Sequence, residues 1–161
     1  MNQITTQYVT ENGACYEQYV ITDPAAKTSL TITPERGGMI TGFTLDGDEY
    51  IWTRRPNFSE CNRPRFGVPV LFPSCGNPDG GVHLFDGKAY PMECHGFADL
   101  CAWEVESVGP DGVTLILEST PLTKFLYPFD FTLLVNYDLN GTTASISMTV
   151  INEGDVPMPF S

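Results

Sequence analysis

The clearest structural signal in the chain is FDFTLLVNYDL (residues 129–139), followed by NG (140–141) and TTASISMTVI (142–151). Both arms are rich in β-branched and aromatic residues, which favour extended strands. The Asn-Gly pair between them supplies the positive φ angles that a two-residue hairpin turn needs. The stretch therefore predicts two antiparallel strands joined by a tight turn.

Further short strands are predicted on the N-terminal side of this hairpin. Asp46-Gly47 and Asp86-Gly87 mark two more hairpin turns. No window shows a sustained helical period with caps at both ends, and the prolines of 121–128 limit that segment to a helical turn. Regular antiparallel meanders pack face to face, so we predict an all-β fold, an antiparallel β-sandwich that forms one domain over residues 1–161. The predicted strands are 16–21, 29–33, 39–45, 49–52, 83–85, 89–90, 103–108 and 113–118.

Composition narrows the classes of partner. The hydrophobic fraction of 42% and charged fraction of 17% are typical of a soluble globular domain. A net charge of −12 argues against nucleic acid and anionic membrane surfaces as partners, and no apolar run approaches the about 20 residues of a spanning helix. Four of the eight cations, Arg54, Arg55, Arg63 and Arg65, lie in one short segment. They either pair with nearby carboxylates or create a local positive field beside a pocket.

Five cysteines without a C-x-x-C pair, and an N-terminus without a signal-peptide pattern, favour reduced thiols in a cytoplasmic protein. His83, Cys94 and His95 are the residues that could suggest a zinc site. Their spacing matches no metal signature, and a free thiol beside a histidine is the commoner arrangement. We expect no metal and no other cofactor.

Candidate binding residues gather in two runs, RFGVPVLFPSCGN (65–77) and HGFA (95–98). Arg65 offers a fixed fork of donors, and the Asn77 amide can both donate and accept. His95 can donate to or accept from a hydroxyl group. Each residue alone could equally serve the fold, as a paired arginine or a satisfied histidine. Together they form the residue mix of a sugar-binding pocket.

Aromatic residues and prolines complete this pattern. The rings of Phe72 and Phe97 are predicted to offer faces on which the C–H side of a sugar could lie. Pro69 and Pro73 bracket the apolar stretch 68–72. Because proline cannot donate to a central ladder, this stretch is expected at a sheet edge or turning into a cleft.

These runs resemble the aldose 1-epimerase (galactose mutarotase-like) family. The similarity rests on 65–77 and on HGFA followed by WEV (103–105), with PERGG (34–38) upstream and the closing stretch 150–161. The resemblance implies a large β-sandwich of which this chain is the N-terminal half, and interconversion of the α and β anomers of a free or phosphorylated sugar. It further implies that Arg65 and His95 contact substrate, with Asn77 as a weaker match.

Anomer interconversion by ring opening requires a base for the anomeric hydroxyl and an acid for the ring oxygen. The resemblance implies that the acid is a second histidine and the base a glutamate, both beyond residue 161. His95 matches the binding histidine of the family and not the acid. We therefore expect no catalytic residue in this chain, and no activity of residues 1–161 alone.

One departure from the family concerns the substrate. The family commonly has arginine directly after HGFA, whereas this chain has Asp99. An aspartate there should repel a phosphate dianion, which favours a neutral hexose over a sugar phosphate.

Length leaves other functions open, because family members are roughly twice as long. The chain could be a non-catalytic carbohydrate-binding or regulatory module. It could also be a structural half-sandwich that another chain completes, since exposed strand edges favour homo-oligomers. We expect the end at Ser161 to reflect an engineered fragment, a gene-level truncation or a partial record.

Overall fold

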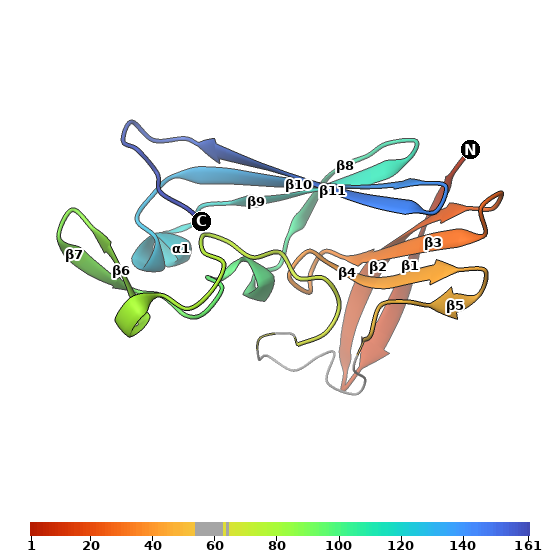
Figure 1. Cartoon of the computed structure of the whole chain (residues 1–161), viewed down its shortest axis with the longest axis horizontal. Helices are drawn as coiled ribbons and strands as arrows, with labels where there is room; N and C mark the ends of the chain where they lie inside the picture. The colour runs from red at the N-terminus through yellow and green to blue at the C-terminus, as the bar shows by residue number, and fades with distance from the viewer. Residues whose placement is uncertain (54–62, 64) are drawn as a thin grey trace.

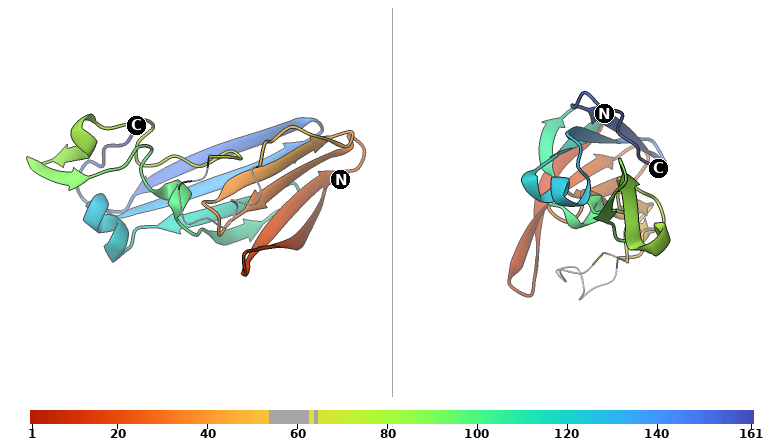
Figure 2. Two further views of the ribbon diagram at one scale, coloured as in Figure 1. Left: turned by 90° about the horizontal axis from the view of Figure 1, so that it is seen from below. Right: turned by 90° about the vertical axis from the view of Figure 1, so that its left-hand side faces the viewer.

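The structure, a computed structural model, describes residues 1–53, 63 and 65–161. Arg54, Arg55 and Cys61, which entered the analysis of the sequence, lie outside these residues. Figure 1 shows two stacked β-sheets. A separate hairpin, formed by β6 and β7, lies at the end of the molecule away from the N-terminus. The same hairpin projects from that end in the second view (Figure 2). The predicted antiparallel β-sandwich is confirmed.

Both sheets are antiparallel meanders in sequence order. The first contains β1 (Gln3–Glu11), β2 (Ala14–Asp23), β3 (Thr28–Thr33), β4 (Met39–Leu45) and β5 (Asp48–Glu49). The second contains β8 (Glu104–Val108), β9 (Gly112–Glu118), β10 (Phe131–Asn140) and β11 (Thr143–Asn152). Outside them lie β6 (Val82–Phe85), β7 (Lys88–Pro91), the helix α1 (Pro121–Leu126) and the 3₁₀ turns η2 (Asp79–Gly81) and η3 (Ala98–Leu100).

The hairpin that led the sequence analysis is present, with its turn one residue later than expected. Asn140 pairs with Thr143, so Gly141 and Thr142 form the turn. Gly141 has the required positive φ of 57°, while Asn140 is the last residue of β10. The turn at Asp46-Gly47 has both residues at positive φ, as predicted.

Two strands differ from the prediction. Residues 49–52 were expected as a strand, but β5 covers only Asp48–Glu49. The sequence analysis missed β1, which pairs with β2 along its whole length. Most β1 side chains are exposed, so the strand lacks the apolar alternation that marks a half-buried strand. The Asn12-Gly13 turn, with φ of 50° and 81°, was the signal that could have revealed it.

The core lies between the two sheets. β10 alternates strictly between buried and half-buried residues, as a strand with one core face must. Its buried side chains meet those of β3 and β9 in one apolar cluster. Representative fully buried members are Leu30, Ile32, Leu115, Leu133 and Val135.

Hydrogen bonds also join the two sheets. The Tyr137 hydroxyl on β10 donates to the backbone carbonyl of Gly38, just before β4. The Thr28 hydroxyl donates to the carbonyl of Gly141 at 2.7 Å. Burial raises the pKa of the Tyr137 hydroxyl, so it stays a neutral donor. These bonds connect β10 and the β10–β11 turn to the first sheet.

Two isolated bridges hold the segment 68–72, one to the first sheet and one to the segment that contains Gly96. Val68 donates its N–H to the Ile40 carbonyl of β4 at 2.9 Å, and Phe72 forms a parallel bridge with Gly96. The stretch 68–72 thus contacts strand backbone without joining a ladder, in agreement with the positions of its prolines. No helix in the described part of the chain is long and apolar enough to cross a membrane.

Candidate functional site

His95 is held by a reciprocal pair of hydrogen bonds with Gly76. The His95 N–H donates to the Gly76 carbonyl at 2.8 Å, and the Gly76 N–H donates to Nδ1 of the imidazole at 3.0 Å. Since Nδ1 accepts, the ring proton lies on Nε2, which leaves that nitrogen as a donor. The His95 backbone has a φ of 70°, a left-handed conformation uncommon for a residue with a side chain.

Gly96 follows with a φ of 75° and lies directly against the loop of Phe72. A Cβ atom at this position would stand 2.1 Å from the Phe72 carbonyl oxygen, so only glycine fits. That carbonyl accepts the N–H groups of Phe97 at 2.9 Å and Ala98 at 3.2 Å. The HGFA run is therefore fastened along its backbone to the run that ends at Asn77.

An ion pair between Arg63 and Asp99 contacts the HGFA run. Arg63 Nη1 donates to both oxygens of the Asp99 carboxylate at 2.6 and 2.7 Å. Nη2 donates to the Gly96 carbonyl at 2.6 Å and lies 3.7 Å from Glu93. The Asp99 side chain is 1% exposed. Of the four clustered arginines, Arg63 thus follows the prediction of local pairing.

An open hollow of about 640 Å³ lies beside this segment. Asn77 and Gly96 line it from the two candidate runs, and Cys94 lines it as well, so both neighbours of His95 are part of its wall. The remaining lining residues are mainly apolar: Gly81, Pro91, Met92, Glu93, Phe97, Leu100 and Leu126. A mostly apolar wall with a few polar groups is the usual composition of a small-molecule site.

The three residues predicted to bind substrate have different surroundings. His95 is half-buried, and Asn77 is exposed on the loop before η2, one residue after the Gly76 that holds His95. Arg65 is exposed, and within the described residues no hydrogen bond joins it to His95 or Asn77. The arginine that does touch the His95 segment is Arg63, which the sequence analysis treated only as part of a cluster.

The proposed sugar-facing role of Phe72 is wrong. Its side chain is 1% exposed and lies in an aromatic cluster, with ring centroids 5.6 Å from Tyr127 and 5.1 Å from Phe131. Phe72 is therefore a core residue. Phe97, which packs edge-on against it, is also buried but lines the hollow.

Asp99 likewise differs from expectation. Its carboxylate was expected to repel a phosphate, but it is buried and faces the Arg63 guanidinium. Burial raises the pKa of the Asp99 carboxyl, and the charge and hydrogen bonds of Arg63 only partly offset this rise. Because Arg63 and Asp99 carry opposite charges and form an ion pair, Asp99 gives no reason to expect repulsion of a phosphate.

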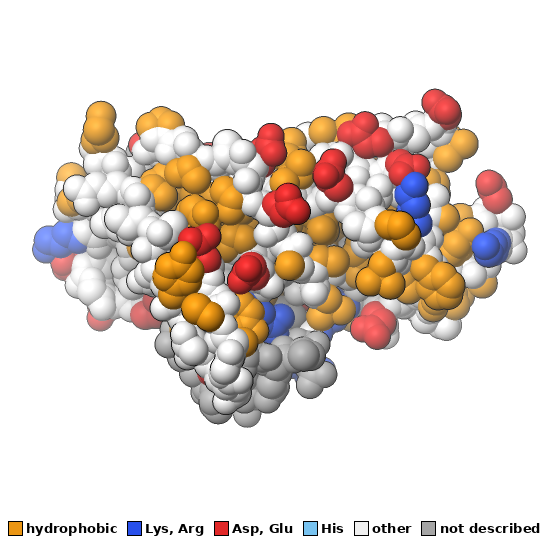
Figure 3. Space-filling view, turned by 180° about the vertical axis from the view of Figure 1, so that it is seen from behind, with side chains coloured by type: hydrophobic (Ala, Val, Ile, Leu, Met, Phe, Trp, Pro, Cys, Tyr) orange, Lys and Arg blue, Asp and Glu red, His pale blue; other side chains and the backbone are white. Residues whose placement is uncertain are grey.

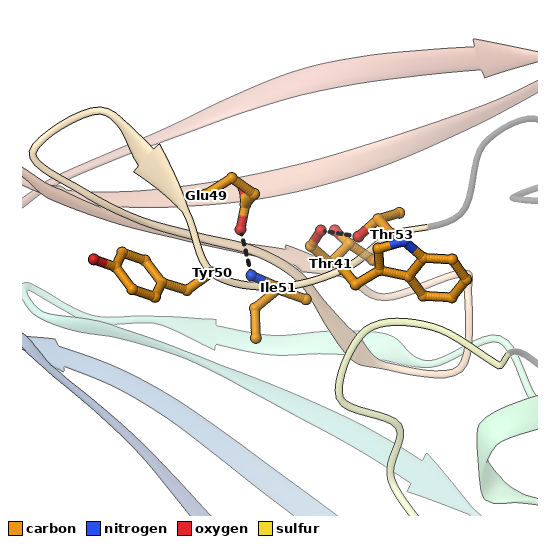
Figure 4. Close-up of a pocket in the computed structure, with 6 residues that line it drawn as sticks. Thr41, Glu49, Tyr50, Ile51 and Thr53 are labelled. Atoms are coloured by element: carbon orange, nitrogen blue, oxygen red, sulfur yellow. Dashed lines mark hydrogen bonds between the residues drawn. The ribbon is translucent and has the colours of Figure 1, made fainter.

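A second hollow of about 480 Å³ lies at the end of the first sheet (Figure 4). Glu49 faces it, but Oε1 of this side chain already accepts the N–H groups of Phe43 and Ile51, both at 2.8 Å. The Thr53 hydroxyl donates to the Thr41 carbonyl at 2.6 Å. Because these polar groups satisfy the backbone around them, the His95 segment is the better candidate site.

The acidity of the chain is visible on its surface. Carboxylates are spread over the face shown in Figure 3, and Lys and Arg appear there at only a few points. The described residues that line the 640 Å³ hollow include Glu93 and no lysine or arginine. The site thus offers hydrogen-bond donors without a free positive charge.

Comparison with known proteins identifies the family. The model of the aldose 1-epimerase family matches residues 17–161. Two LacX proteins of Lactococcus lactis subsp. lactis, one plasmid-encoded and one chromosomal, are each 28% identical over 131 residues. The match covers 77% of this chain and 42% of either relative. The chain thus spans less than half the length of these relatives.

Solved structures share the fold. A protein from Synechocystis sp. PCC 6803 superposes with a TM-score of 0.86 at 30% identity, over 99% of this chain and 55% of that one. A galactose mutarotase related enzyme from Lactobacillus acidophilus gives a TM-score of 0.78 at 28% identity, over 89% and 46% of the two chains. The galactose mutarotase-like sandwich predicted from the sequence is therefore confirmed.

The raised pKa of Asp99 predicts a pH dependence of stability. An acid whose pKa is higher in the folded state loses stability when it ionises. The free energy of unfolding of the wild type, relative to Asp99→Asn, should therefore fall as pH rises above about 4 and then level off. Urea titrations at a series of pH values measure this difference. A relative stability that rises with pH would show that attraction to Arg63 exceeds the cost of burial.

Proposed function

Because the chain belongs to the aldose 1-epimerase family, we propose that it binds a hexose at the His95 segment and carries the binding half of an anomer-interconverting site. The observation that carries this proposal is the Gly76–His95 pair of hydrogen bonds. It leaves the Nε2–H group as a donor of fixed direction, which suits a hydroxyl or ring oxygen of a sugar. The Asn77 amide on the adjoining loop adds a donor and an acceptor.

A neutral hexose fits this site better than a sugar phosphate. The guanidinium of Arg63 is committed to Asp99 and to the Gly96 carbonyl, so it is not available to a phosphate. The exposed Glu93 carboxylate stands on the wall of the hollow and disfavours a dianion. Arg65 is the remaining candidate for a substrate contact from the first run.

Among the described residues, neither the second histidine nor Asp99 is placed to transfer a proton to a sugar at the His95 segment. The sequence contains two histidines, and the second of these, His83, lies on β6 with its ring 5.8 Å from that of Phe85. Asp99 is buried in its ion pair and lies behind the HGFA backbone. Without an acid and a base on opposite sides of the sugar ring, the chain binds substrate but does not open the ring.

Self-association is a second candidate function, supported by the edge strand β11. Ile146, Met148 and Ile151 on this strand are 48%, 48% and 37% exposed. An apolar groove of about 210 Å³ runs beside two of them, toward Val68 and Leu71. A second copy of the chain could pair with this edge and cover the groove.

Hexose binding is measured by following the backbone amide signals of the chain during titration with glucose or galactose. We expect saturable shifts at Gly76, Asn77 and Gly96 that are lost in His95→Ala, and no stronger response to the corresponding 6-phosphate. His83→Ala, the matched control, should bind like the wild type. A clear preference for the phosphate contradicts the neutral-sugar proposal, and unchanged binding by His95→Ala contradicts the site.

Catalysis is tested by polarimetry on freshly dissolved α-glucose or α-galactose. Residues 1–161 should give no rate above that of buffer, because the proton-transfer pair is missing. A clear acceleration that survives in His95→Ala would place an acid and a base elsewhere in this chain and reverse the assignment.

Self-association is tested by light scattering over a range of protein concentrations. A dimer is expected to form as concentration rises, and Met148→Glu should abolish it by placing a charge on the apolar edge. The exposed Leu122→Glu change on α1 serves as the control. A monomer at all concentrations rules this second function out.

A further inference from the structure

The Arg63–Asp99 pair holds both ends of the segment that follows His95. One guanidinium nitrogen binds the Asp99 carboxylate, at the middle of η3, and the other binds the carbonyl of Gly96. The planar fork of arginine makes these contacts simultaneously, which the single nitrogen of lysine cannot do in the same geometry. A single side chain thus bridges the start and the end of the Gly96–Asp99 turn.

This bridge completes the hydrogen bonding of one buried peptide group. In the peptide between Gly96 and Phe97, the N–H donates to the Phe72 carbonyl and the C=O accepts from Arg63. His95, immediately before it, has an unfavourable left-handed backbone conformation. Such conformations persist when the surrounding structure fixes them from several sides. Loss of Arg63 would leave the Gly96 carbonyl buried without this partner.

The location of the pair argues for a role other than stability. Burying two charges costs desolvation energy, and apolar residues of similar volume often stabilise a fold as well or better. Burial is also the largest influence on the pKa of the Asp99 carboxyl, and it raises that pKa. In this molecule the pair bonds to the backbone directly after His95, at the Gly96 carbonyl.

We propose that Arg63 and Asp99 form a positioning pair that orients the His95 imidazole, through the Gly96 carbonyl, for its contact with the sugar. This inference rests on the proposed role of His95 in hexose binding. Its primary test needs no sugar, because the orientation of the ring is measured in the free protein.

The test follows the ring nitrogens of His95 by two-bond ¹H–¹⁵N correlation spectra of the whole chain. With two histidines present, His83→Gln assigns both rings. The wild type should show His95 with its proton on Nε2. In Arg63→Met this signature should give way to a mixture of tautomers, and exchange of the Gly76 amide proton should become at least about tenfold faster, which corresponds to about 1.4 kcal/mol.

Two further variants separate positioning from stability. Lys27→Met breaks the exposed Lys27–Asp46 pair with the same change of charge and should leave His95 unaltered. The double variant Arg63→Met/Asp99→Leu should regain thermal stability, yet keep the tautomer mixture of Arg63→Met. A double variant that restores the wild-type His95 signature would make the pair purely structural and overturn the proposal, as would an unchanged signature in Arg63→Met. If Arg63→Met does not fold, Arg63→Lys takes its place with the same expected loss.

Discussion

The backbone of Phe72 is the point on which the candidate site depends. Its ring is buried among the aromatic side chains of the core, and its carbonyl oxygen accepts two successive N–H groups of the HGFA run. The same carbonyl leaves room for only a hydrogen atom at Gly96. Two irregular segments are thereby fastened to a rigid sandwich at one residue. Because the Phe72 ring is packed in the core, the position of its backbone is fixed relative to the two sheets.

Polar groups around this point are divided between two tasks. Arg63 binds Asp99 and the Gly96 carbonyl, and the N–H groups of the HGFA run bind backbone carbonyls. Within the described residues, the Nε2 atom of His95 and the Asn77 amide have no such partner. A binding site of this kind needs its supporting hydrogen bonds completed before ligand arrives, since unsatisfied buried groups would compete for them. The Arg63–Asp99 ion pair supplies such supporting hydrogen bonds beside the candidate site.

Local patterns predicted most of this fold, and contacts between distant residues account for what they missed. Strand β3 and the Asp-Gly turns follow from alternation and turn chemistry, which depend on neighbouring residues. The role of Phe72 could not be predicted, because a phenylalanine before a proline is equally compatible with a core position and with a ring that faces a sugar. The Arg63–Asp99 pair joins residues 36 positions apart. The resemblance to the family marked Asp99 as unusual, because arginine is common there, but the burial and the partner of Asp99 are properties of the folded chain.

The bond between Tyr137 and Gly38 spans 99 positions, and it has a consequence for how the molecule forms. The meander β1–β5 contains only local pairings, which close cheaply and early. The two sheets meet, however, only after β10 exists, and the loops of Phe72 and His95 rest on the core between them. The His95 segment therefore depends on a strand that follows it in the chain, and it cannot take its final shape until β10 has been synthesised.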